Sequence, residues 1–212
     1  MANDWDGIYK KHGTWLEKPH EDMPRVADLF QARGVKRVLD LGCGAGRHMV
    51  YLAQRGVQVW GLDSSEEALK MAQEALAKTG LRGELTAGSM YETLPYARGF
   101  FDAIVCTKAL NHGTIGSIRL AIKEMERALK PGGGLFMVVT KSRKVLPSKK
   151  QERDCEIIAE RTLIPKQGRE IGVVHYQFNK EILLREFRHF RVLDVRVDSE
   201  RNYSMTAVLR VL

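Results

Sequence analysis

The chain has 212 residues and a formal net charge of +8, and this length favours one α/β domain with one substantial core. Hydrophobic residues make up 44% and charged residues 28%, which is ordinary for a soluble globular protein. No apolar run approaches the ~20 residues of a membrane span, and the acidic N-terminal segment lacks the apolar region of a signal peptide. We therefore expect a cytoplasmic protein with no membrane partner.

The three cysteines, Cys43, Cys106 and Cys155, show no metal-ligand spacing. We expect reduced thiols and no metal site. Part of the basic excess lies in residues 141–150, which hold five lysine and arginine residues. Such a run is typical of a solvated loop, although it also suits docking of a nucleic acid or another anionic partner.

Short β-rich runs alternate with amphipathic stretches, a pattern that predicts a parallel sheet with helices on both faces. Ser64 and Glu67 have the spacing of a capping box, which predicts the start of a helix that ends near residue 78. In chain order the other predicted elements are helix 22–33, strand 36–41, helix 47–55, strand 57–62, strand 84–87, strand 100–107, helix 115–129, strand 135–140, strand 173–178, helix 179–187, and strands 192–197 and 205–211.

The first strand runs directly into a glycine-rich turn, Gly42-Cys43-Gly44-Ala45-Gly46, and a helix follows it. Such a turn lets a ligand approach the backbone, and the start of the helix offers N–H groups. A dinucleotide fingerprint needs its third glycine at position 47, where this chain has Arg47. Gly46-Arg47-His48 also lacks the lysine that ends a P-loop. The spacing therefore favours a ligand other than these two.

Two acidic residues narrow the ligand class. Asp40 precedes the first glycine by two residues, where a carboxylate repels a pyrophosphate but favours a cation. S-adenosylmethionine carries both an ammonium and a sulfonium, so it suits this position. Asp63 ends the second predicted strand, 21 residues after Gly42, where a carboxylate can accept both ribose hydroxyls.

Four stretches in the right order, 38–46, 61–65, 101–105 and 129–133, resemble the motifs of class I S-adenosylmethionine-dependent methyltransferases of the small-molecule type. The resemblance implies a doubly wound, mostly parallel, Rossmann-like α/β sheet of seven strands in the order 3-2-1-4-5-7-6, with strand 7 antiparallel. It also implies a single domain over 1–212. We divide it into a helical cover (1–35), a cofactor-binding core (36–140), an insertion or lid (141–169) and a C-terminal hairpin (170–212).

Position by position, the resemblance places the three turn glycines against the methionine part of the cofactor, Asp63 on its ribose and Ser89 near its adenine. Many family members have aspartate where this chain has Ser89. Arg47 is either a group that captures a carboxylate or a surface arginine whose stem packs on the protein. The predicted cofactor contacts are Asp40, Gly42, Cys43, Gly44, Gly46, Arg47, Asp63, Ser64, Ser89, Met90, Thr107 and Lys108.

His112 follows the fourth predicted strand, at the edge of the sheet where ligands of open α/β folds bind. We predict that it is the general base for a hydroxyl, thiol or protonated amine acceptor; a loop histidine bonded to backbone is the alternative. The other predicted substrate contacts are Asn111, His175, Tyr176, Tyr9 and Trp15. Trp5, Tyr9, Trp15 and Leu16 form either an aromatic lid or a patch that packs on the sheet.

The acceptor class follows from absent motifs. Cys106-Thr107-Lys108-Ala109 stands where amino-methylases of nucleic-acid bases have an Asn/Asp-Pro-Pro-Tyr/Phe run, and neither Cys106 nor Cys155 is placed as a nucleophile. We therefore predict a small-molecule acceptor and a monomer or homodimer. The alternatives are an RNA or protein methyltransferase that docks through 141–150, a non-catalytic adenosylmethionine-binding module, and a nicotinamide oxidoreductase.

Overall fold

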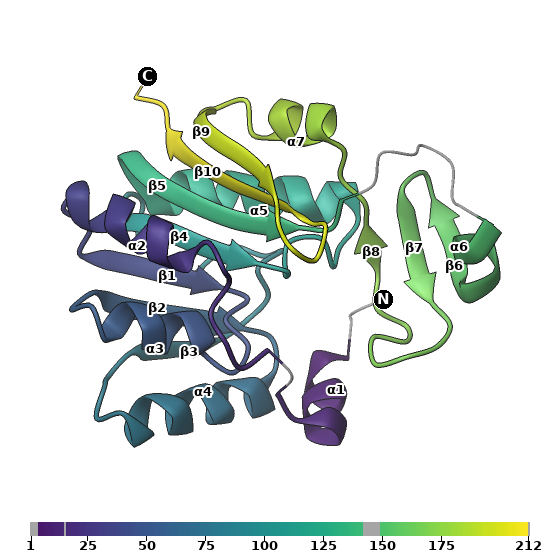
Figure 1. Cartoon of the computed structure of the whole chain (residues 1–212), viewed down its shortest axis with the longest axis horizontal. Coiled ribbons are helices and arrows are strands. Elements are labelled where there is room, and N and C mark those ends of the chain that lie inside the picture. Colours follow the sequence, from purple (N-terminus) through teal and green to yellow (C-terminus); the bar gives the residue numbers. More distant parts are fainter. Residues whose placement is uncertain (1–3, 15, 142–148, 212) are drawn as a thin grey trace.

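The computed structural model describes residues 4–14, 16–141 and 149–211 (Figure 1). Its centre is a seven-stranded sheet in the order β3-β2-β1-β4-β5-β10-β9, in which β10 is antiparallel to both neighbours. This order confirms the predicted topology. The strands are β1 (Arg37–Leu41), β2 (Gln58–Asp63), β3 (Glu84–Ala87), β4 (Phe101–Thr107), β5 (Leu129–Val139), β9 (Phe190–Val197) and β10 (Tyr203–Leu209).

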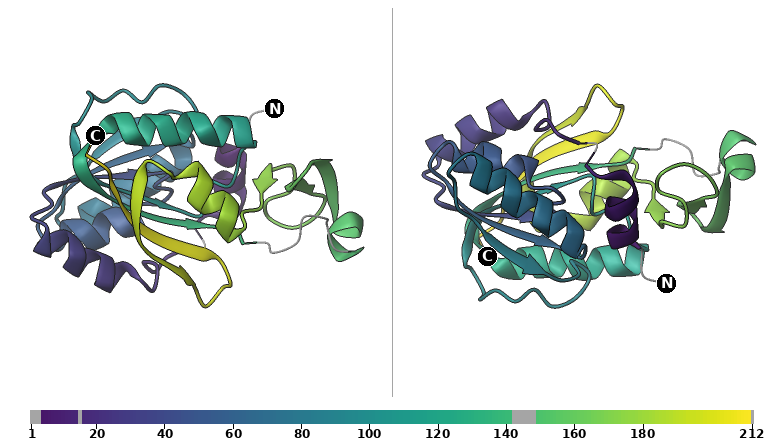
Figure 2. Two further views of the ribbon diagram at one scale, coloured as in Figure 1. Left: turned by 90° about the horizontal axis from the view of Figure 1, so that it is seen from above. Right: turned by 90° about the horizontal axis from the view of Figure 1, so that it is seen from below.

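Helices cover both faces of the sheet, as Figure 2 shows from two sides. The period of two along each strand sends alternate side chains to opposite faces. Leu39 and Ile104 join the core under α5 and α7, whereas Val38 and Val105 join the core under α2 and α3. The helices are α2 (Met23–Ala32), α3 (Arg47–Ala53), α4 (Glu66–Lys78), α5 (Ile115–Ala128) and α7 (Lys180–Glu186). Among the described residues, no helix is long and apolar enough to cross a membrane.

The start of α4 differs from the prediction. Ser65, not Ser64, is the N-cap, because its extended backbone lets its hydroxyl accept a hydrogen bond from the Ala68 N–H at 3.0 Å. The predicted capping box of Ser64 and Glu67 is therefore wrong. Asn179 caps α7, with its side chain accepting from the Ile182 N–H at 2.7 Å.

The parallel strands point toward a helix and a small sheet at one end of the molecule (Figure 1). The helix is α1 (Trp5–His12), and the small sheet holds β6 (Cys155–Ala159), β7 (Thr162–Pro165) and β8 (His175–Tyr176) beside α6 (Lys149–Asp154). The predicted strand 173–178 is wrong in length, because only His175 and Tyr176 form a strand, and they pair with β7 instead of the large sheet. This end of the molecule is where open α/β sheets bind ligands.

Candidate active site

A cavity of about 650 Å³ lies at the carboxyl ends of the parallel strands. This volume is typical of sites for small molecules, which span about 300–1,000 Å³. Its wall combines the glycine turn, the ends of β2 and β4, the segment after β3, helix α1 and the edge of the small sheet. The predicted site residues that line it are Tyr9, Gly42, Cys43, Gly44, Arg47, Asp63, Ser64, Ser89, Met90, Thr107, Lys108, Asn111, His112 and His175.

The glycine turn follows β1, and hydrogen bonds to β2 hold it in place. Its three glycines adopt left-handed backbone conformations. The N–H groups of Gly42 and Cys43 donate to the Leu62 carbonyl at 2.8 and 3.2 Å. Gly42, Gly44 and Gly46 have φ of 75°, 53° and 79°, values that favour glycine over other residues. Gly46 does not line the cavity; a side chain there would contact Ala72 of α4 at 2.9 Å, so this glycine serves helix packing.

Asp63 lies at the end of β2 and fixes the glycine turn from the other side. One carboxylate oxygen accepts from the Gly44 N–H at 2.8 Å, and the other accepts from the Ser65 N–H at 3.0 Å. Burial raises the pKa of this carboxyl, and the backbone donors oppose that rise. Each oxygen keeps a further lone pair, so the carboxylate can still accept the two hydroxyls of a ribose.

Asp40 lies behind the glycine turn, 1% exposed and outside the cavity wall. Neither of its carboxylate oxygens has a hydrogen-bond partner among the described residues. Burial raises its pKa to about 7, and the positive charge of Arg47 partly opposes this. A buried carboxyl without a partner is destabilising when it ionises, and a cation held at the turn relieves that cost. This arrangement fits the ammonium and sulfonium of S-adenosylmethionine.

His48 packs beneath Asp40. Its Nε2 accepts a hydrogen bond from the His20 N–H at 3.1 Å, so its proton is on Nδ1, which lies 3.3 Å from Thr107 Oγ1 and 3.9 Å from Asp40 Oδ2. Burial holds the pKa of His48 well below its usual range. The ring is therefore neutral and does not supply the missing cation.

Arg47 and Lys108 form the polar wall on the side of the β9–β10 turn. Arg47 donates to the Lys18 carbonyl at 3.0 Å and to Thr107 Oγ1 at 3.4 Å, and burial lowers its pKa. Lys108 pairs with Glu200 at 2.5 Å. Arg47 is thus an ordered part of the wall and not a freely solvated arginine, which favours the carboxylate-capture interpretation.

Ser89, in the segment after β3, lines the cavity. Its hydroxyl accepts from the Tyr91 N–H at 3.2 Å, and the Tyr91 hydroxyl donates to the Leu110 carbonyl at 3.1 Å. Tyr91 also lines the cavity and was not predicted from the sequence. Because it bridges the segments after β3 and β4, it sets the distance between the predicted adenine side and the loop that carries His112.

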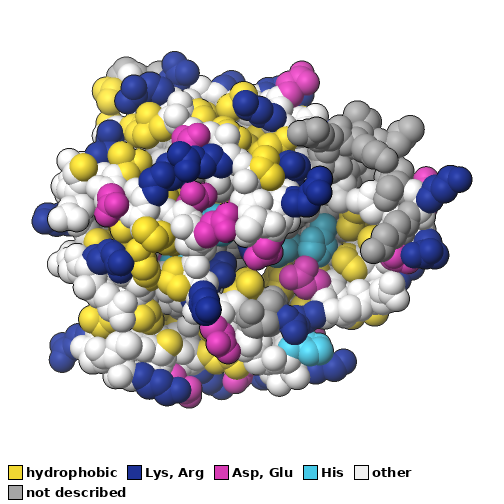
Figure 3. Space-filling model, viewed as in Figure 1, with side chains coloured by type: hydrophobic (Ala, Val, Ile, Leu, Met, Phe, Trp, Pro, Cys, Tyr) yellow, Lys and Arg dark blue, Asp and Glu magenta, His cyan; other side chains and the backbone are white. Residues whose placement is uncertain are grey.

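The loop after β4 and strand β8 bring two histidines together at the other side of the cavity. The rings of His112 and His175 have centroids 4.8 Å apart, and Trp5 of α1 packs on His112 at 4.7 Å. Burial, with the neighbouring His175, lowers the pKa of His112 to about 3. Nε2 of His175 lies 3.1 Å from a carboxylate oxygen of Glu170, a cavity residue that sequence reasoning missed. Figure 3 shows histidine and acidic side chains gathered between the large and small sheets.

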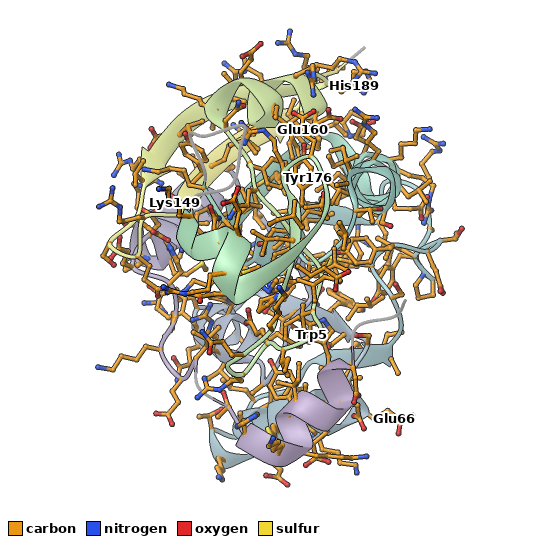
Figure 4. All side chains as sticks on the ribbon, turned by 90° about the vertical axis from the view of Figure 1, so that its right-hand side faces the viewer. Trp5, Glu66, Lys149, Glu160, Tyr176 and His189 are labelled. Carbon is orange, nitrogen blue, oxygen red and sulfur yellow. The ribbon has the colours of Figure 1, made fainter. Side chains whose placement is uncertain are left out.

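Tyr176 does not line the cavity. It is 5% exposed, belongs to the core with α5 and α7, and packs on Phe178 at 5.0 Å. Trp15 lies outside the described residues, as do Arg143 and Lys144 of the basic segment 141–150. Of the proposed lid, Trp5, Tyr9 and Leu16 line the cavity, and in Figure 4 Trp5 points from α1 toward the sheet edge.

Helix α1 is anchored to the start of α4 by Asp6. This carboxylate accepts from the Glu67 N–H at 2.9 Å and from the Ser65 hydroxyl at 3.1 Å, and it pairs with Lys10 at 2.7 Å. Lys10 and these donors lower the pKa of Asp6 to about 2. The contact fixes Trp5 and Tyr9 in the cavity wall.

Asp6→Ala is expected to weaken binding of S-adenosylhomocysteine about fivefold, because apparent affinity falls with the fraction of molecules in which α1 is docked. Titration calorimetry measures the change. Lys10→Ala is the matched control: it removes an exposed ion pair but leaves both α4 contacts, and we expect less than about a twofold effect. Equal affinities of Asp6→Ala and the wild type would show that α1 does not contribute to binding.

Comparison with known proteins agrees with this geometry. A family model described as "Methyltransferase domain" matches residues 38–133. The ubiquinone biosynthesis O-methyltransferase of Dechloromonas aromatica is 37% identical over 102 residues, which cover 48% of this chain and 43% of that protein. The ribosomal RNA small subunit methyltransferase C of Alcanivorax borkumensis is 35% identical over 108 residues, which cover 50% of this chain and 32% of that protein.

A solved structure shares the fold. A SAM-dependent methyltransferase from Methanosarcina mazei has a TM-score of 0.71 and 22% identity, with 83% of this chain and 93% of that chain covered. The match to each of the two curated relatives spans less than half of that relative's length. The glycine turn, the strand order and these matches together support a class I S-adenosylmethionine-dependent methyltransferase, a family whose cofactor is S-adenosylmethionine.

Proposed function

We propose that the chain transfers the methyl group of S-adenosylmethionine to a nitrogen, oxygen or sulfur atom of a small molecule. The observation that carries the proposal is the cavity itself. It joins the glycine turn and Asp63 to His112 and His175, and α1 covers it. A site of about 650 Å³ between these walls suits a cofactor together with a small acceptor more than it suits a folded macromolecule.

The residues divide into two groups by what they do. Asp63 orients the ribose, the backbone of the turn approaches the methionine part, and Asp40 offsets its positive charge. When bound, the cofactor supplies an electrophilic methyl group on a sulfonium that leaves as a neutral thioether. Catalysis then consists mainly of holding the acceptor atom in line with that methyl group. Trp5 packs on His112 and narrows the acceptor side.

Ligand binding and turnover test the proposal together. We expect S-adenosylhomocysteine to raise the melting temperature of the protein and NAD(H) to leave it unchanged. Radioactive methyl from S-adenosylmethionine should then appear in one of a panel of catechols, thiols and small amines. Stabilisation by NAD(H) alone would contradict the cofactor assignment. The small-molecule acceptor would be overturned if the protein bound the cofactor but methylated only RNA, and if its binding to RNA fell steeply with rising salt concentration.

His112 carries a specific prediction on the acceptor side. His112→Ala is expected to lower kcat about 100-fold or more, in the range that a proton-accepting or acceptor-positioning group contributes. The Kd for S-adenosylhomocysteine should change less than about threefold, because this ring lies away from Asp63 and the glycine turn. Steady-state kinetics and calorimetry separate the two effects. If the variant kept the kcat of the wild type, His112 would have no part in the reaction. The role of His112 as general base stays a prediction.

A further inference from the structure

Three side chains of types that commonly bind metal ions lie close together in the cavity wall. They are His112 in the loop after β4, His175 in β8 and Glu170 in the turn before β8. Their ligand atoms all lie within 4.8 Å of one another, and Nε2 of His175 is 3.1 Å from Oε2 of Glu170. This is the one group of three or more such residues found within the described part of the chain.

The backbone holds the two histidines in place. The Tyr176 N–H donates to the Asn111 carbonyl at 2.7 Å, and each of these residues is the chain neighbour of one histidine. Trp5 packs on one side of His112 at 4.7 Å. When contacts with the rest of the protein already hold the ligand side chains in place, the site loses less conformational entropy on binding an ion.

The donor set indicates the ion. Two imidazoles with one carboxylate form a common set of protein ligands for catalytic zinc and for related divalent transition metals, which leave further coordination positions open. In a tetrahedral zinc site with bonds of about 2.0–2.1 Å, ligand atoms are about 3.4 Å apart. The 3.1 Å pair is close to this spacing, and the third ligand atom, which lies within 4.8 Å of the other two, would move closer when an ion binds.

We propose that His112, Glu170 and His175 bind a divalent transition-metal ion of the zinc class. All three residues line the cavity, so an open coordination position faces the space that we assign to the acceptor. The proposal departs from the expectation of no metal site in the sequence analysis. Its role in the reaction rests on the proposed function, whereas metal binding itself does not.

In place of His112 as general base, the ion would activate an acceptor hydroxyl or thiol. Coordination lowers the pKa of a bound O–H or S–H group, and its proton leaves to water. The resulting anion forms a bond to the methyl carbon while the carbon–sulfur bond of the sulfonium breaks, which yields the methylated acceptor and a thioether. No oxidation or reduction takes place. A metal site thus favours oxygen and sulfur acceptors over amines.

Direct metal titration tests the site. The protein is freed of any affinity tag, stripped with EDTA, and titrated with ZnCl₂ by calorimetry and with CoCl₂ by visible absorption. We expect one equivalent of Zn²⁺ with a Kd below about 1 μM, and a cobalt absorption band typical of a four- or five-coordinate site. MgCl₂ should compete weakly, because Mg²⁺ prefers oxygen ligands.

Variants assign the ligands. His175→Ala and Glu170→Gln should each weaken zinc binding about 100-fold or more, since each removes a direct ligand. His189→Ala is the matched control: it removes another histidine–glutamate pair, with Glu126 at 3.0 Å. This pair lies outside the cavity wall, and in Figure 4 His189 is near the top of the view, away from Trp5. The control variant should bind zinc as the wild type does. Unchanged affinity for S-adenosylhomocysteine shows that each variant is folded.

The outcomes separate this site from the proposed function. Absence of stoichiometric zinc binding, or wild-type zinc binding by His175→Ala and Glu170→Gln, overturns the metal site. Methyl transfer that persists in EDTA would then leave the methyltransferase proposal intact. Zinc binding without any binding of S-adenosylhomocysteine would contradict the methyltransferase proposal while supporting the metal site.

Discussion

Asp63→Ala is expected to weaken binding of S-adenosylmethionine and S-adenosylhomocysteine about 100-fold or more. Hydrogen bonds to a charged group contribute about 1.5–3 kcal/mol each, and the variant loses two to the ribose. It also leaves the Gly44 and Ser65 N–H groups without their acceptor, so the turn itself loses order. Calorimetric titration with S-adenosylhomocysteine measures the change in Kd.

Asp102→Ala is the matched control for Asp63. Its carboxylate likewise accepts from two backbone N–H groups, those of Lys36 and Arg37 at 2.9 and 2.8 Å, but it lies at the start of β4, away from the cavity. We expect lower thermal stability with an unchanged Kd. If Asp63→Ala bound as tightly as this control, the ribose would not contact Asp63.

Asp40→Asn is expected to stabilise the ligand-free protein at alkaline pH and to weaken the cofactor complex. Because burial raises the pKa of Asp40 to about 7, the folded state holds this proton more tightly than the unfolded state. The stabilisation is complete below the unfolded pKa of about 4 and is lost as the pH rises to about 7. The charged or titratable groups that interact with this carboxyl include His48 and Arg47 of α3, Asp63 of β2, Tyr9 of α1, Cys43 of the glycine turn and Cys106 of β4.

At pH 8 the variant should melt about 4–8 °C above the wild type, as expected for about 2 kcal/mol in a chain of this size, and near pH 4 the difference should vanish. At pH 8 its Kd for S-adenosylmethionine should rise about tenfold or more, since a carboxylate beside a cation is lost. Scanning calorimetry across pH and titration calorimetry measure both.

Asp102→Asn should show the opposite sign, because Lys130 and backbone donors hold the pKa of Asp102 below its usual value. We therefore expect Asp102→Asn to be less stable than the wild type at neutral pH. A wild type with flat stability between pH 4 and pH 8 would contradict a raised pKa for Asp40.

The sheet and the glycine turn could be predicted from the sequence because their signals are local. The spacing of Gly42, Gly44 and Gly46 and the runs of buried residues in β1 and β4 follow from short-range sterics and the strand period. The error at Ser64 is of the same kind: Ser64 and Ser65 both have capping chemistry, and the geometry of the turn after β2 decided between them.

The acceptor side could be predicted only in part. His112 and His175 were predicted, but Glu170 lies in a turn whose position depends on how the small sheet packs on the large one, and no local pattern reports that. The sequence could have shown that His175 and Tyr176 do not both face the cavity, because neighbouring residues of a strand face opposite sides. The structure shows that His175 takes the cavity side. A monomeric or dimeric state and a cytoplasmic location stay predictions.

The anchoring of α1 has a consequence for the timing of turnover. Trp5 and Tyr9 belong to the cavity wall, and Asp6 ties their helix to Ser65, whose N–H is held by Asp63. We therefore expect α1 to detach when spent S-adenosylhomocysteine is exchanged for a fresh molecule, and lid movements of this kind often set kcat. We expect a burst of product in the first turnover, followed by a slower steady rate limited by departure of the spent cofactor.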